Sequence, residues 1–138
     1  MITLKKQEVV KLEDVLHLYQ AVGWTNYTHQ PQMLEQALSH SLAIYLALDG
    51  DAVVGLVRLI GDGFSSVFVQ DLIVLPTYQR QGIGSRLIKQ ALGDFKDAYQ
   101  VQLVTDQTEK TLVFYHSLGF ESLSTYDCTG MIWVERKK

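Results

Sequence analysis

A short turn in the middle of the chain carries the residues best suited to bind an anion. Gly82 and Gly84 follow an apolar run that ends at Val74 and Pro76, and an amphipathic stretch comes directly after them. The first N–H groups of a helix have no backbone acceptor, and the helix dipole adds partial positive charge there. Glycine lets a phosphate approach the backbone closely. The spacing therefore predicts a phosphate-binding turn between a strand and a helix.

Two common phosphate-binding motifs do not fit this turn. The dinucleotide fingerprint requires a third glycine where the chain has Leu87. The P-loop requires Gly-Lys-Ser/Thr, whereas Gly84 is followed by Ser85 and Arg86. A turn whose glycines serve packing alone is the alternative. Three cationic residues lie close by in the sequence and favour an anion: Arg80, Arg86 and Lys89.

A longer string of residues resembles the acetyl-CoA signature of the GNAT N-acetyltransferase superfamily. Gln79-x-x-Gly82-x-Gly84 matches the family pattern Gln/Arg-x-x-Gly-x-Gly/Ala, and residues 114–120 look like its F-Y-x-x-x-G-F segment. The order of the elements agrees along nearly the whole chain. The chain looks most like small bacterial GNAT proteins and plant-type serotonin (arylalkylamine) N-acetyltransferases. Three segments carry that narrower likeness: Val22-Gly23-Trp24, the Asp-x-x-Val-x-Pro run that opens at Asp71, and Gly130-Met131-Ile132-Trp133.

The resemblance implies direct transfer of an acetyl group from acetyl-CoA to an amine. The main-chain N–H groups of the turn would bind the pyrophosphate, and the N–H of Leu72 would stabilise the oxyanion of the thioester carbonyl. The pantetheine arm would lie along the strand at Ile73 and Val74, like an added strand. No metal takes part. The residues assigned to acetyl-CoA in this way are Leu72, Ile73, Val74, Gln79, Arg80, Gln81, Gly82, Ile83, Gly84, Ser85 and Phe114.

Two proton transfers accompany this reaction. Tyr115 stands where the family has its tyrosine acid, and a phenol with a pKa of about 10 is protonated at neutral pH. Tyr78 is the second candidate for the acid. Asp71 is a possible base for the amine. Simple alternation places it on one strand face with its apolar neighbours, where a carboxylate is costly unless it is paired or functional. A base and a buried ion pair are both open for Asp71.

The acceptor pocket is expected between the first two helices and a late hairpin. Trp24 and Tyr27, with the intervening Thr25 and Asn26, would line it from one side. Tyr126 and Trp133 would contribute from the hairpin. Aromatic side chains suit an aromatic or cationic amine, although they can equally be core. We expect a small-molecule amine as acceptor. The alternatives are a protein lysine or N-terminus, or a non-catalytic acyl-CoA-binding module.

The elements that must position these residues follow from hydrophobic periodicity. We expect an α/β (α+β) fold: a central mixed, mostly antiparallel sheet of about six to seven strands with helices on both faces. The predicted helices cover residues 11–22, a stretch from Pro31, 82–95, and a stretch that Asp106 caps and that ends near Ser117. The predicted strands are 2–5, 41–48, 52–60, 66–74, 101–104, 120–124 and 130–135.

The composition excludes several classes of protein. The 138 residues, 47% hydrophobic and 20% charged, predict one globular domain over residues 1–138. A net charge of -3 does not favour nucleic acid, and no apolar stretch is long enough to span a membrane. The histidines lack zinc-ligand spacing. The single Cys128 is expected to be at least half-buried and favours a reducing, cytoplasmic location. A monomer and a homodimer are both open.

Overall fold

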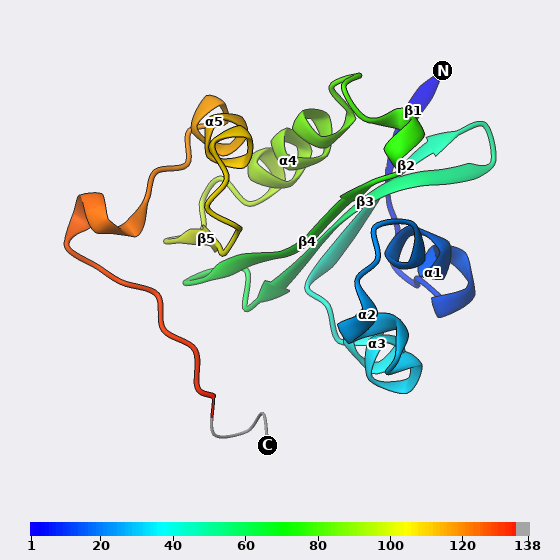
Figure 1. The fold of residues 1–138 in the computed structure, drawn as a ribbon, viewed down its shortest axis with the longest axis horizontal. Helices are drawn as coiled ribbons and strands as arrows, with labels where there is room; N and C mark the ends of the chain where they lie inside the picture. The colour runs from blue at the N-terminus through cyan, green and yellow to red at the C-terminus, as the bar shows by residue number, and fades with distance from the viewer. Residues whose placement is uncertain (135–138) are drawn as a thin grey trace. The chain divides into compact units, whose positions relative to one another are not determined.

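The computed structural model describes residues 1–134, which fall into two compact units, the first being Met1–Leu103 (Figure 1). A five-stranded sheet with the order β1-β2-β3-β4-β5 forms the first unit. The pairs β1–β2, β2–β3 and β3–β4 are antiparallel, and β5 is parallel to β4. The expected mixed, mostly antiparallel α/β sheet is therefore confirmed. The strands are β1 Ile2–Lys6, β2 Ala43–Asp49, β3 Ala52–Gly61, β4 Val67–Val74 and β5 Val101–Leu103.

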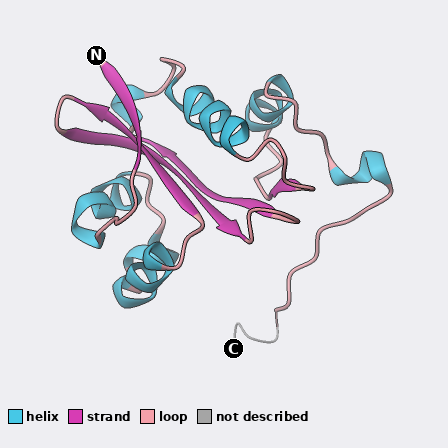
Figure 2. Cartoon of the chain, turned by 180° about the vertical axis from the view of Figure 1, so that it is seen from behind, coloured by secondary structure: helices cyan, strands magenta, loops and turns pink. Residues whose placement is uncertain are grey.

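Helices of the first unit lie on both faces of this sheet, as expected (Figures 1 and 2). Three of them lie on one face: α1 Leu12–Ala21, α2 Thr25–Thr28 and α3 Pro31–Ser39. The other face carries α4 Ile83–Asp94, which a 3-10 turn, η1 Pro76–Tyr78, connects to β4.

The periodicity of the sequence explains which side of each helix is buried. Apolar residues three and four apart form one stripe on a helix, and that stripe packs on the sheet. The α4 stripe is buried as expected and consists of Ile83, Leu87, Ile88 and Ala91. The core on the opposite face joins α1, α2 and α3 to β2, β3 and β4 through Val10, Val15, Leu18, Tyr19, Tyr27, Leu34, Leu38, Ile44, Leu46, Leu56 and Ile73.

A bulge in β4 corrects the expected alternation. Arg58 pairs with Asp71 and the next residue of β3, Leu59, pairs with Val69, so Gln70 is an extra residue in β4. One extra residue turns the side chains after it to the other face. Val69 lines a space with residues of α4, whereas Asp71 contacts side chains of α1 and α2. The prediction that one face carries both residues is therefore wrong.

Two predicted strands near the C-terminus are absent from the described residues. The second unit, from Val104 onward, contains α5 Glu109–Ser117 and a 3-10 turn, η2 Leu123–Tyr126, where a strand over 120–124 was expected. Residues 130–134 form neither helix nor strand, and position 135 of the other predicted strand lies outside the described residues. A strand requires a hydrogen-bonded neighbour, which apolar alternation alone cannot supply. The described sheet accordingly has fewer strands than predicted.

The ends of α5 test two capping predictions. Gly119 takes the left-handed conformation expected just past the helix, with φ of 95°. The expected Asp106 cap is wrong, because the hydroxyl of Thr108 accepts the Thr111 N–H at the N-terminus of α5. Asp106 instead accepts hydrogen bonds from the N–H and the hydroxyl of Thr108, at 3.0 and 2.7 Å. Thr108, which caps α5, is therefore held by Asp106, the residue that was predicted to cap this helix.

Two further observations concern composition. None of the helices within residues 1–134 has the length and apolarity that crossing a bilayer requires. Cys128 is exposed, and its thiol lies 3.4 Å from the carbonyl oxygen of Tyr126. The expectation that this cysteine is at least half-buried is therefore wrong.

Candidate active site

The predicted oxyanion donor lies on a strand edge that the sheet leaves open. The Leu75 N–H donates to the Val54 carbonyl of β3 at 2.9 Å. Backbone groups of alternate residues point to the same neighbour, so those of Leu72 and Val74 point away from β3. On that side β5 pairs with β4 only at residues 67–69, within the part of the chain that the structure describes. The N–H of Leu72 therefore faces an edge without a strand neighbour.

The predicted phosphate-binding turn has the backbone of an anion-binding loop. Gly82 caps α4 with a left-handed φ of 78°, and a Cβ placed on it would meet no atom within 4 Å. Arg80 is also left-handed, with φ of 66°, which is uncommon for a residue with a side chain. Such alternation of conformations gathers successive N–H groups into a concave anion site. The loop thus combines a strained backbone with open space over Gly82.

The start of α4 leaves several donors unused by the helix. The first intrahelical bond runs from the Arg86 N–H to the Gly82 carbonyl, so the N–H groups of Ile83, Gly84 and Ser85 precede the helical ladder. No side chain caps Gly82 among the described residues. These donors, together with the dipole of α4, fit the pyrophosphate of a CoA molecule.

Polar side chains around the loop tie it to the sheet. The side-chain amide of Gln79 donates to the Val74 carbonyl at 3.0 Å, which closes the loop onto the end of β4. The guanidinium of Arg86 donates to the Ile2 carbonyl of β1 at 3.2 Å. Arg80 and Lys89 are exposed. Of the three cations expected near the turn, one is therefore engaged with the edge strand β1.

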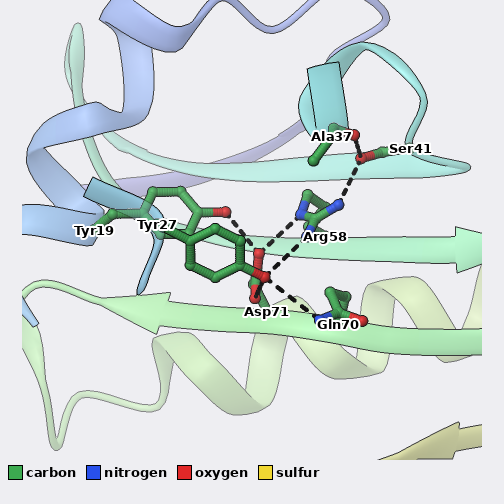
Figure 3. Close-up of polar contacts among 7 residues, drawn as sticks. All are labelled: Tyr19, Tyr27, Ala37, Ser41, Arg58, Gln70 and Asp71. Carbon is green, nitrogen blue, oxygen red and sulfur yellow. Dashed lines mark hydrogen bonds and ion pairs between the residues drawn. The ribbon is translucent and has the colours of Figure 1, made fainter. Parts of the chain in front are cut away.

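Asp71 belongs to a buried network of charged and phenolic groups (Figure 3). Its carboxylate is 3% exposed and lies 2.8 Å from the Nε of Arg58, which is itself 4% exposed. The hydroxyl of Tyr19 donates to Oδ2 at 2.8 Å, and that of Tyr27 donates to Oδ1 at 2.9 Å. Of the two roles open for Asp71, the ion pair is the one that the structure displays, and the role of base is still a prediction.

Electrostatics keep the two phenols of this network protonated near neutral pH. Burial raises the pKa of the Tyr19 phenol, and the Asp71 carboxylate raises it further. The pKa of Tyr27 is raised by the same two causes. Burial opposes the charge of Arg58, but Asp71 and the neighbouring phenols act against it, and the net pKa of Arg58 is raised. Both phenols are therefore protonated donors to the carboxylate.

The predicted acceptor residues fall in two places. Trp24 and Tyr27 stand at α2, where the half-buried indole lies 6.1 Å from the Tyr19 ring and 6.3 Å from the Tyr27 ring, between centroids. Tyr27 is buried in the core. In the second unit, Tyr126 and Trp133 are both largely exposed, and the Tyr126 hydroxyl donates to Glu121.

The two candidate acids have different surroundings. Tyr115 stands on α5 among aromatic rings, with edge-on contacts to Phe114 and Phe120 at 4.9 and 5.8 Å between centroids. Burial, and secondly the charge of Asp106, raise the pKa of Tyr115. The hydroxyl of Tyr78 donates to Asp49 at 2.6 Å, and this bond raises the pKa of Tyr78. The hydroxyl proton of Tyr78 therefore points at the β2–β3 hairpin.

Sequence reasoning missed Arg58 and Gln70. Arg58 is the one charged residue in the apolar run 52–60, which is the available signal that it pairs with a buried charge. The guanidinium also donates to the Tyr27 hydroxyl at 3.1 Å and to Ser41 at 3.2 Å. Gln70 is the bulged residue, and its amide donates to the Tyr27 hydroxyl at 3.4 Å. No feature of the sequence marked the bulge.

An open strand edge beside a strand–loop–helix turn is the arrangement that an extended anionic ligand lying across both would require. Residues 40–122 match the family model described as the acetyltransferase (GNAT) domain. The chain belongs to the GNAT acetyltransferase family.

Similar proteins agree with this assignment. The GNAT family protein SP0256 of Streptococcus pneumoniae TIGR4, an acetyltransferase by name, is 79% identical, with a TM-score of 0.92 over 99% of both chains. GCN5-related N-acetyltransferase 1, chloroplastic, of Arabidopsis thaliana is 24% identical over 95% of this chain, which spans 66% of that protein. Aminoglycoside N-acetyltransferase AAC(6')-Iy in complex with CoA shares the fold, with a TM-score of 0.71 at 17% identity over 96% of this chain and 93% of that one.

Proposed function

We propose that this protein is an acetyl-CoA-dependent N-acetyltransferase that acts on the primary amine of a small molecule. The observation that carries the proposal is the loop that follows β4. It presents the N–H groups of Ile83, Gly84 and Ser85 beside the left-handed Gly82, where a Cβ would meet no atom within 4 Å. The CoA complex of AAC(6')-Iy, which has the same fold, supports acetyl-CoA as the donor.

The reaction is a direct transfer. The amine nitrogen, in its neutral form, attacks the thioester carbon, a C–N bond forms, and the carbonyl oxygen gains negative charge. The N–H of Leu72 would stabilise that charge, because backbone donors held at the developing oxyanion lower the barrier. The C–S bond then breaks, and the sulfur leaves with the electron pair. The open edge of β4 at Leu72 and Val74 supports a pantetheine arm lying there as an added strand.

Three proton transfers accompany this reaction. Tyr115 would protonate the leaving thiolate, and its raised pKa keeps the phenol protonated at neutral pH. The attacking amine must lose a proton to become neutral and a second after attack. Asp71 already accepts hydrogen bonds from Tyr19 and Tyr27 and is paired with Arg58. Solvent is therefore a better acceptor for the amine protons than this carboxylate.

A thiol-release assay with acetyl-CoA and a panel of amines tests the proposal. The panel contains aromatic, aliphatic and aminoglycoside amines, together with a lysine peptide. We expect release of free CoA with at least one small amine. Tight CoA binding without turnover on any amine would instead show a binding module. Turnover on the peptide alone would show a protein acetyltransferase.

A further inference from the structure

The short helix α2 depends on its contacts with the sheet for its position. It has four residues and no side-chain cap at its N-terminus, and helices of this length do not persist alone in water. Its buried side chain is Tyr27. The other residues of the segment predicted to line the acceptor pocket are the exposed Thr25 and Asn26 and the half-buried Trp24. Whatever holds Tyr27 therefore sets where this segment lies.

Three side chains of the sheet hold the Tyr27 hydroxyl (Figure 3). The hydroxyl donates to Asp71 Oδ1 at 2.9 Å, and it accepts from Arg58 Nη2 at 3.1 Å and from Gln70 Nε2 at 3.4 Å. The Arg58 guanidinium also lies 5.9 Å from the centre of the Tyr27 ring. Arg58, Gln70 and Asp71 are here called the Tyr27 clamp.

The clamp is fixed at the bulge of β4. Gln70 is the bulged residue and Asp71 follows it, so two of the three clamp residues directly precede Leu72, the predicted oxyanion donor. Arg58 is anchored independently, because its Nη1 donates to the Ser41 hydroxyl, which in turn donates to the Ala37 carbonyl of α3 at 2.7 Å. The clamp thus couples α2 to the backbone at the proposed reaction centre.

We propose that Arg58 is a positioning residue for amine recognition, which acts through the Tyr27 hydroxyl to hold α2 at a set distance from the Leu72 amide. This inference rests on the proposed function. It differs from a purely structural ion pair in one respect. The Tyr19 and Tyr27 hydroxyls each donate one bond to the same carboxylate, at 2.8 and 2.9 Å, and the Tyr27 hydroxyl also accepts bonds from Arg58 and Gln70. A purely structural role would change the stability of both phenylalanine variants and leave the KM for the amine unchanged.

The shared carboxylate supplies a matched pair of variants. Tyr27→Phe and Tyr19→Phe each remove one phenolic hydroxyl and leave a ring in the core, and both keep the Arg58–Asp71 pair. We expect Tyr27→Phe, which removes the bond to Asp71 and those from Arg58 and Gln70, to raise the KM for the amine about five- to tenfold, with little change in the Kd for CoA. Tyr19→Phe should lower thermal stability, because it removes one hydrogen bond to Asp71. It should raise the KM for the amine less than half as much as Tyr27→Phe does.

Hydrogen exchange gives a readout that does not depend on activity. The amides of residues 24–30 should exchange faster in Tyr27→Phe than in Tyr19→Phe. Arg58→Lys keeps the positive charge but lacks the fork that reaches Asp71, Ser41 and Tyr27 together, so it should resemble Tyr27→Phe in KM and exchange. Equal KM values and equal exchange in the two phenylalanine variants would overturn the inference. An inactive wild-type protein would overturn the proposed function first, and the two failures are therefore distinguishable.

Discussion

Substitution of Gly82 separates the backbone requirement of the loop from its electrostatics. Gly82 has φ of 78°, and a Cβ at this position would meet no atom within 4 Å, so alanine meets no obstacle in the free protein. The cost of Gly82→Ala is the left-handed conformation itself, about 1 kcal/mol of unfolding free energy. Gly50, in the β2–β3 turn, provides the matched control, with φ of 61° and the same open surroundings. Gly50→Ala should cost about as much.

CoA binding should distinguish these two variants, and a charge should enlarge the effect. Gly82→Ala places a methyl group where the diphosphate would approach, whereas Gly50→Ala does not. Gly82→Asp adds a carboxylate near that diphosphate. Two like charges at about 4 Å repel by about 1 kcal/mol in water-like surroundings and about 4 kcal/mol at a protein surface of lower effective dielectric. The Kd for CoA should then rise roughly fivefold to several-hundredfold.

Isothermal titration of the wild type and the three variants with CoA and with pantetheine, which lacks the phosphates, measures this effect. We expect Gly82→Asp to weaken CoA strongly and pantetheine hardly at all, with Gly50→Ala like the wild type for both ligands. Equal CoA affinity in Gly82→Asp and in the wild type would refute the assignment of the loop. Equal losses for both ligands would show that the loop supports the fold and makes no phosphate contact.

Three further predictions concern side chains. Tyr115→Phe should lower turnover by about 10²-fold or more, with a smaller effect on the Kd for CoA. Because the pKa of Tyr115 is raised, ionisation of this phenol should not limit turnover between about pH 6 and 9. A fall in turnover within that range that disappears in the variant would contradict the assignment. Tyr78→Phe should retain turnover within about threefold, since its hydroxyl donates to Asp49; a loss as large as a general acid supplies would make Tyr78 the acid instead. The Ser65 hydroxyl donates to Asp62, as do the N–H groups of Phe64, Ser66 and Ser65, and these bonds hold the pKa of Asp62 well below its ordinary value. A lowered folded-state pKa adds stability that is complete above about pH 4 and is lost progressively as the pH falls towards the folded-state pKa, so Asp62→Asn should lower the Tm less at pH 2 than at pH 7; an equal deficit at both pH values would refute the linkage.

The sequence predicted those elements whose pattern is local. The α4 stripe, the left-handed Gly119 and the strand–loop–helix turn at Gly82 depend on nearest neighbours and on helix geometry, and each is present. Apolar alternation failed where pairing between strands decides the outcome. The extra Gln70 reverses the faces of β4, and only the register against β3 reveals it.

The sequence likewise predicted only part of the candidate site. The loop was predictable because glycine spacing encodes its backbone conformation. Arg58 was not predicted, although the sequence held a signal, a single charge inside an apolar strand. Its partner Asp71 was recognised as costly, but which of the two roles it has depends on contacts with Tyr19 and Tyr27 from distant parts of the chain. Such contacts follow from the packing of α1 and α2, which periodicity does not define.

The central claim is that CoA binds along the open edge of β4 and into the turn before α4. The most direct measurement is a titration of ¹⁵N-labelled protein with CoA, followed by the chemical shifts of the backbone amides. The largest changes should occur at Gly82, Ile83, Gly84 and Ser85, and at Leu72. Saturable binding that leaves these amides unchanged and shifts others would contradict the account.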